Sequence, residues 1–144
     1  MLSQKAKYAV RAVLYLALES DPVIGLKGGK DVSRELNTPL AFTSKILLEL
    51  ARANIVTSVK GPGGGFYLSQ ENLKKPLIRV VEATGDLTSF TTCGLGLKEC
   101  SEKFPCPIHS TFKVGRNDLL SLFRNKTIAE LATEIKETHL FLVR

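Results

Sequence analysis

The sequence predicts a mainly α-helical protein with a small β-hairpin wing: a winged helix-turn-helix head joined to a long dimerisation helix. Two short helical patterns separated by a tight break cover 30–36 and 40–53. Two short strands around a glycine-rich tip follow directly, and an apolar stripe covers 107–125. The first features are typical of a helix-turn-helix with its wing, and the stripe is typical of a coiled-coil seam.

The size and composition indicate an ordinary globular protein. The chain has 144 residues, enough to bury a real core, and 44% of them are hydrophobic. It contains no apolar run long enough to span a bilayer, and its first eight residues lack the apolar core of a secretion signal. We therefore expect a cytoplasmic protein with no membrane partner.

The first predicted helix covers 3–19, where apolar residues recur at helical spacing. Ser3 is a suitable N-cap. Asp21-Pro22 ends the helix, because proline removes a backbone donor and disfavours helical geometry in the residue before it.

A helix-turn-helix is predicted next, with its break at Asn37-Thr38-Pro39. The second of its helices has a buried stripe made of Phe42, Ile46, Leu47 and Leu50. The residues left facing outward are Ala41, Ser44, Lys45, Glu49 and Arg52. In a DNA-binding helix-turn-helix this second helix enters the major groove with its N-terminal end first.

The predicted wing consists of strands over 55–59 and 66–68 around the tip Lys60–Gly65. The rival interpretation of the tip is a phosphate-binding nucleotide loop. That loop requires a lysine and a hydroxyl residue opening a helix after the glycines, whereas Phe66 and the next two residues continue as a strand. We therefore favour the hairpin.

Three further helices are predicted after the wing. One starts at Lys75-Pro76 and ends before Thr84-Gly85, and the last begins at Thr127. Between them, the helix over 107–125 carries the stripe of Ile108, Phe112, Gly115, Leu119 and Leu122. We favour pairing with a second copy, which Gly115 would allow to approach closely. The alternative is packing on the chain's own head.

These elements divide the chain into three parts. We expect residues 1–85 to form the winged helix-turn-helix domain, 86–106 a cysteine-rich loop that would bind a metal or cluster, and 107–144 the dimerisation helix and the C-terminal helix.

The clearest chemical signal is the group Cys93, Cys100, Cys106 and His109. These are all three cysteines and one of the two histidines of the chain, collected in one short segment. Thiolate and imidazole ligands suit iron–sulfur clusters and zinc better than magnesium or calcium. The segment is therefore interpreted as a metal or cluster site, and the second histidine, His139, as a packing or surface residue.

Other interpretations of the cysteines remain open. Four such ligands could close a structural zinc site, or the thiols could act as a switch without metal. An electron carrier is a further possibility from another class of protein. A cysteine nucleophile with His109 as its base is disfavoured, because no third group orients the base, and we expect no enzyme activity.

The net charge indicates the kind of partner. The formal charge is +6 and the pI is near 9.3, which favours an acidic partner such as double-stranded DNA. Expected phosphate or groove contacts come from Ser3, Lys5, Lys45 and Lys60. Ala41, Thr43 and Ser44 are expected to reach base edges, and Gly63 and Gly64 to let the wing tip enter the minor groove.

Three segments together resemble the IscR-like family of bacterial transcription regulators. They are Lys7–Val10, the wing segment Ser58–Phe66, and the three-cysteine loop, in this order. The resemblance covers about residues 2–132. It implies DNA binding by a homodimer in which crossed long helices join two winged heads, with redox, nitric oxide or iron–sulfur status as the sensed signal.

The resemblance also implies a cofactor. Some members hold a 2Fe–2S cluster with three cysteines and one histidine, and Cys93, Cys100, Cys106 and His109 match them one by one. Other members hold a 4Fe–4S cluster and use an acidic residue from the partner's first helix. Here no Asp or Glu occurs before Glu19, which favours the 2Fe–2S type and His109. Such a cluster can be lost from an aerobically prepared sample.

Two departures from IscR itself imply a different specificity. The gap between Cys93 and Cys100 is six residues rather than five. Ser44 stands where IscR has a base-reading glutamate, which implies another operator sequence. The resulting hypothesis is that cluster binding orders the loop and sets the spacing of two heads, roughly 34 Å apart for half-sites one helical turn apart.

Overall fold

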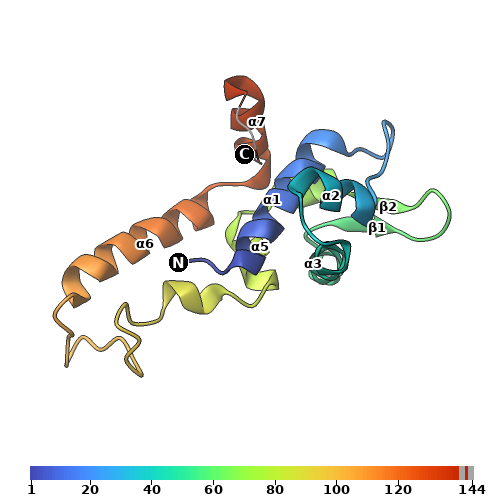
Figure 1. Ribbon diagram of the computed structural model, residues 1–144. Coiled ribbons are helices and arrows are strands. Elements are labelled where there is room, and N and C mark those ends of the chain that lie inside the picture. Colours follow the sequence, from blue (N-terminus) through green and yellow to red (C-terminus); the bar gives the residue numbers. More distant parts are fainter. Residues whose placement is uncertain (140–141, 143–144) are drawn as a thin grey trace.

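The computed structural model describes residues 1–139 and 142 and is mainly helical, with one two-stranded wing (Figure 1). The predicted fold class is confirmed. Residues 140, 141, 143 and 144 of the predicted C-terminal part lie outside the described residues. The elements in chain order are α1 (Gln4–Glu19), α2 (Gly29–Leu36), α3 (Leu40–Arg52), β1 (Thr57–Val59), β2 (Gly65–Tyr67), α4 (Gln70–Leu73), α5 (Ile78–Ala83), the short 3-10 helix η1 (Leu87–Phe90), α6 (His109–Asn125) and α7 (Ile128–Thr138).

Helix α1 lies at the centre of the head and contacts α2, α3, α5 and α7. Ser3 caps it as predicted, because its Oγ accepts a hydrogen bond from the Ala6 N–H at 3.1 Å. Ala9, Val13 and Leu16 are fully buried. Burial of such apolar side chains is the main source of stability in the head.

The helix-turn-helix is built by two local features. Asp31 in the first turn of α2 accepts the N–H of Gly28 at 2.8 Å. Asn37 ends α2 in the left-handed conformation, with φ of 51°, which this residue tolerates better than most. Helix α3 then buries Ile46, Leu47 and Leu50, as its apolar spacing predicts.

The wing is a tight antiparallel hairpin attached to the loop before α2. Ser58 pairs with Phe66, and Phe66 also exchanges backbone hydrogen bonds with Lys27, at 2.8 and 3.0 Å. At the tip, a Cβ on Gly64 would lie 2.2 Å from the Val59 carbonyl oxygen. Only glycine fits at position 64, so the conformation of the tip requires this residue.

The C-terminal helix α7 packs on the head rather than extending the long helix α6. It contacts α1, and Ile128 is fully buried in the same core. The Ile128 N–H donates to the Lys75 carbonyl at 3.0 Å, and the Leu77 N–H donates to the Lys126 carbonyl at 2.9 Å. Helix α7 therefore contributes to the core of the head.

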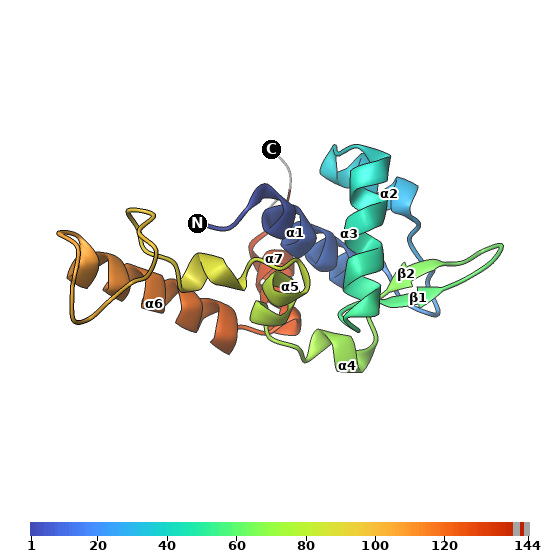
Figure 2. The same cartoon turned by 90° about the horizontal axis from the view of Figure 1, so that it is seen from below.

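The segment from η1 to α6 forms an arm that leaves the head and returns to it. The chain passes out along η1, turns through the cysteine loop and comes back along α6, with the loop at the end opposite the wing (Figures 1 and 2). Phe123 of α6 packs on Phe90 of η1, with ring centroids 5.7 Å apart, near the base of the arm. No helix within residues 1–139 is long and apolar enough to cross a membrane.

Candidate nucleic-acid interface and cysteine loop

The N-terminal part of α3 presents a short polar surface. Ala41 and Lys45 are exposed and Ser44 is half-buried. The Ser44 Oγ lies 3.0 Å from the position that a Cβ on Gly29 would take, so Gly29 allows α2 and α3 to approach closely. Ala41 and Lys45 are thus open to solvent, whereas Ser44 lies at the contact of α3 with α2.

Thr43 does not belong to this surface, and its expected role as a base contact is corrected. Its side chain is only 3% exposed. The Thr43 hydroxyl lies 2.6 Å from that of Thr38 and 3.1 Å from the Pro39 carbonyl oxygen, to which it donates. Thr43 thus fixes the turn to the start of α3, while Phe42 packs against the core as expected, partly buried, with its ring centroid 5.7 Å from that of Tyr8.

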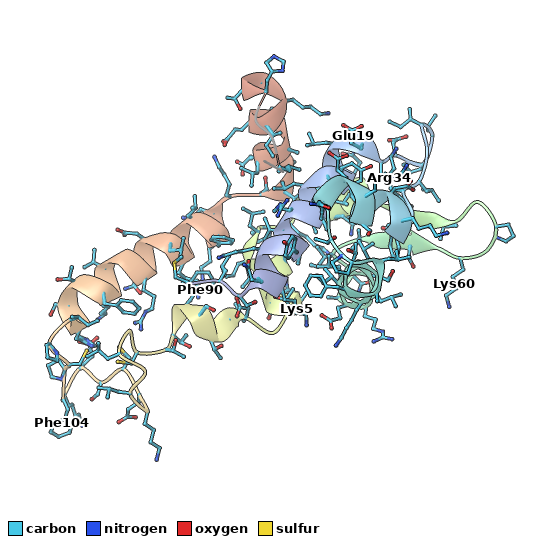
Figure 3. The ribbon with its side chains drawn as sticks, in the orientation of Figure 1. Lys5, Glu19, Arg34, Lys60, Phe90 and Phe104 are labelled. Atoms are coloured by element: carbon cyan, nitrogen blue, oxygen red, sulfur yellow. The ribbon has the colours of Figure 1, made fainter. Side chains whose placement is uncertain are left out.

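The two expected contacts from the N-terminus have partners within the chain. The Lys5 Nζ lies 2.6 Å from the Glu49 carboxylate, joining α1 to α3 (Lys5 is labelled in Figure 3). The Ser3 Oγ caps α1, and the Ser3 N–H donates to Asp86 at 2.7 Å. Both residues therefore have structural roles, and Lys5 is neutralised by an acidic residue.

The wing carries the remaining expected contacts on its exposed tip. Lys60 and Gly63 are exposed, and Lys60 extends from the hairpin into solvent (Figure 3). Gly63 has a φ of 74°, a conformation that favours glycine. The sequence analysis missed Lys30, which is exposed in the first turn of α2. Its position in the first helix of a helix-turn-helix could have identified it, since that helix crosses the DNA backbone.

The cysteine loop is fastened to α6 at both ends. Arg116 of α6 donates to the carbonyl oxygens of Thr91 and Thr92 at 3.3 and 3.1 Å. Gly94 lies so close to the Phe112 ring that an added Cβ would be 2.8 Å from it. At the other end the His109 N–H donates to the Cys106 carbonyl at 2.9 Å. The first residues of α6 therefore hold the loop that precedes them.

The structure brings Cys100 and His109 into direct contact. The Cys100 Sγ and the His109 Nδ1 are 3.4 Å apart, and the His109 side chain is only 6% exposed. On the other side of the ring, Nε2 lies 3.5 Å from a carboxylate oxygen of Glu102, too far for a good hydrogen bond. Lys113, one turn further along α6, forms an ion pair with Glu102. Lys113 also donates a hydrogen bond to the Glu102 carboxylate, and this hydrogen bond is the main reason that the pKa of Glu102 is lowered.

The surroundings of Cys93 favour its thiolate. Backbone N–H groups of Leu95 and Leu97, followed by the Cys106 thiol and the N–H of Gly96, hydrogen-bond to the Cys93 sulfur and lower the pKa of Cys93. Gly96 takes a φ of 72°, so the loop turns back on itself around the sulfur. Hydrogen bonds of this kind favour the thiolate, the form of cysteine that binds metals.

The four expected ligands fit an iron–sulfur cluster by their chemistry. Three thiols and a buried imidazole lie on one loop, and the Cys93 thiolate is favoured by its surroundings. Within the described residues, no three His, Cys, Asp or Glu side chains converge on one point as a single metal ion would require. Three thiolates and one imidazole are a ligand set that iron–sulfur clusters accept.

A helix-turn-helix followed directly by a hairpin wing defines a winged helix-turn-helix, a fold typical of DNA-binding proteins. The chain belongs to the Rrf2 family: the family model, described as an iron-dependent transcriptional regulator, matches residues 2–134. It is a transcription regulator and not an enzyme.

Individual relatives agree with the family. An HTH-type transcriptional regulator of Aquifex aeolicus (strain VF5) is 32% identical, covering 99% of this chain and 98% of the relative. The IscR regulator of Vibrio cholerae is 29% identical over 90% of this chain and 73% of its own length.

Solved structures confirm the fold. The global cysteine regulator CymR of B. subtilis has a TM-score of 0.73 at 18% identity, covering 93% of this chain and 97% of its own. IscR of T. potens has a TM-score of 0.71 at 17% identity, covering 97% of this chain and 91% of its own.

Proposed function

We propose that this chain is a DNA-binding regulator that responds to iron–sulfur or redox status through a cluster held by Cys93, Cys100, Cys106 and His109. One observation carries the proposal: the three cysteines of the chain lie on one loop, and Cys100 of that loop is 3.4 Å from the buried His109 at the start of α6. When bound, the cluster supplies one-electron redox chemistry, and we favour 2Fe–2S over 4Fe–4S.

The residues around the loop support a coupling to the arm. Arg116 and Phe112 hold the first part of the loop, and His109 is itself the first residue of α6. Ordering of Cys93–Cys106 would therefore restrain α6 directly. We infer that the state of the loop sets how α6, and with it the head, is presented to DNA.

We also propose that the active protein is a homodimer formed through the arm. His109 is the only buried residue of α6, and Val114 and Leu122 are 61% and 53% exposed. A groove of about 250 Å³ crosses the predicted stripe at Phe112, Gly115 and Leu119. A long helix with an uncovered apolar stripe is stabilised when another helix covers it, which a second copy would do.

A second groove extends this surface toward the head. It has a volume of about 490 Å³ and is lined in part by Leu2, Tyr8, Val10 and Phe123. It lies where α1 meets the base of α6, so one partner helix could cover both grooves. Burial of these apolar residues would give the dimer most of its stability.

The proposed DNA surface comprises Ala41, Ser44 and Lys45 of α3 together with Lys60, Gly63 and Gly64 of the wing. We expect the α3 residues to reach base edges, and the wing to follow the backbone or the minor groove. Ser3 and Lys5 remain weaker candidates for phosphate contact because both have partners in the chain. Double-stranded operator DNA in the cytoplasm is the proposed partner.

Anaerobic reconstitution tests the cofactor. The native protein should become coloured and bind iron and sulfide in equal amounts. His109→Ala should bind a less stable cluster, and His139→Ala, the matched control, should behave as the native protein. A colourless protein with one zinc per chain would instead support a structural zinc site. A metal-free protein with a reversible disulfide would support a thiol switch.

A further inference from the structure

The His109 ring lies between two chemically different partners. Its Nδ1 is 3.4 Å from the Cys100 Sγ, whereas its Nε2 is 3.5 Å from a Glu102 carboxylate oxygen. The side chain is only 6% exposed, so the neighbouring residues restrict the rotation about the Cβ–Cγ bond that would turn the ring over. The orientation of the ring therefore assigns a different environment to each nitrogen.

Glu102 is held in its place by α6. Lys113 forms an ion pair with Glu102 and lies four residues after His109, on the same side of the helix. The same helix thus supplies the imidazole and the cation that keeps a carboxylate beside it. This arrangement needs no residue from outside the loop and α6.

A neutral imidazole carries one N–H, and the nitrogen that binds a metal must be the other one. A carboxylate beside Nε2 stabilises the N–H at that nitrogen, which leaves the lone pair on Nδ1. Metal-bound histidines commonly donate their second N–H to a carboxylate in this way, which fixes the tautomer and the ring orientation.

Resting on the proposed function, we propose that Glu102 is a positioning residue that holds the proton of His109 on Nε2, so that Nδ1 is the atom that binds the cluster. Lys113 acts through Glu102 by holding its carboxylate. Glu102 is not itself a ligand. A shift of the carboxylate by a few tenths of an ångström would bring it within hydrogen-bond distance of Nε2.

Selective isotope labelling tests which nitrogen binds. Two samples are reconstituted anaerobically in a His139→Gln background, one with the heavy nitrogen isotope at Nδ1 of histidine and the other with it at Nε2. Pulsed electron paramagnetic resonance of the reduced cluster should show strong isotope coupling from Nδ1 and weak coupling from Nε2. The opposite result would overturn this inference and leave the proposed function standing. No uptake of iron and sulfide by the native protein would overturn both.

Variants test the role of Glu102. Glu102→Gln should shift the reduction potential upward, because a negative charge near the cluster is lost, and should give a mixture of nitrogen couplings. Glu102→Asp, which keeps the carboxylate, should largely restore the native spectrum. Glu99→Gln, on the same loop, is the control and should leave both readouts unchanged. If Glu102→Gln matches Glu99→Gln in potential and coupling, Glu102 has no positioning role.

Discussion

Single residues of α3 have sharply different roles although they are neighbours in sequence. Thr43 is buried against the turn, whereas Lys45 is exposed. A helical stripe through 43, 46, 47 and 50 fits the sequence as well as one through Phe42, because both have steps of three and four. Phe42 packs on the core as expected, but Thr43 is buried as well. The periodicity does not reveal that the Thr38 hydroxyl and the Pro39 carbonyl satisfy a buried Thr43.

Lys45→Ala should weaken DNA binding through the loss of a phosphate contact. Each phosphate contributes a slope of about −0.9 to log affinity against log salt, so a dimer that loses Lys45 from both heads should have a slope shallower by about 2. Affinity is measured by fluorescence anisotropy over a range of salt concentrations.

Thr43→Val is the matched control for Lys45→Ala. It removes the hydroxyl from a buried position and should lower the free energy of unfolding by about 1 kcal/mol, with the salt slope of DNA binding unchanged. A native slope for Lys45→Ala, or a changed slope for Thr43→Val, would contradict the assignment of the surface.

At the scale of elements, the amphipathic helices and the wing strands were predicted, and two four-residue helices, α4 and η1, were not. α1, α3 and α6 lie within a residue or two of their expected bounds. α4 has one turn and was not predicted, although the Ser69–Asn72 capping box could have indicated its start. The packing of α7 on α1 depends on contacts between distant segments, which periodicity does not encode.

The cap of α7 should make stability depend on pH. The Thr127 Oγ1 accepts the Glu130 N–H at 3.2 Å, and Glu130 accepts the Thr127 N–H at 2.7 Å. The Thr127 backbone donor, and then its hydroxyl, lower the pKa of Glu130. The ionised carboxylate thus stabilises the fold above its ordinary pKa of 4.5, and this stabilisation is lost as the pH falls through the lowered value.

Glu130→Gln should therefore be less stable than the native protein at neutral pH, and the difference should disappear in acid. Thr127→Ala should lose about 1 kcal/mol. Urea unfolding at several pH values measures both changes. Glu137→Gln, in the last turn of the same helix, serves as the control. A difference between native protein and Glu130→Gln that persists in acid would refute this account of the cap.

Gly115 tests the arm as a dimer interface. Apart from its chain neighbours and the backbone of its own helix, no described residue has a heavy atom within 4 Å of the position of an added Cβ, so a side chain at position 115 is compatible with the fold of one protomer. If a second helix approaches closely at this glycine, the larger side chain should raise the dimer dissociation constant at least tenfold, which is about 1.4 kcal/mol. Analytical ultracentrifugation measures the association.

Asn117→Ala is the matched control for Gly115→Leu, because it changes an exposed position of α6 away from the stripe. It should leave association unchanged. Circular dichroism should show native helix content for both variants. If Gly115→Leu dimerises as tightly as the native protein, two helices do not approach each other closely at Gly115.

At the scale of the whole molecule, the head and the cysteine loop lie at opposite ends, and α6 connects them (Figure 2). The sequence predicted the four candidate ligands, because unusual residue types gathered in one segment are visible without a structure. It did not predict Glu102, Lys113 and Arg116 as their neighbours, because charged residues on a loop and a helix have no pattern that reveals their pairing. These neighbours connect the chemistry of the loop to α6.

The most direct test of this connection is the affinity of the anaerobically reconstituted protein for operator DNA, measured at one salt concentration before and after the iron is removed. We predict that affinity changes at least tenfold when iron is removed, and that it is restored when the cluster is rebuilt. Equal affinity in the two states, with the dimer intact in both, would contradict the claim that the loop controls DNA binding.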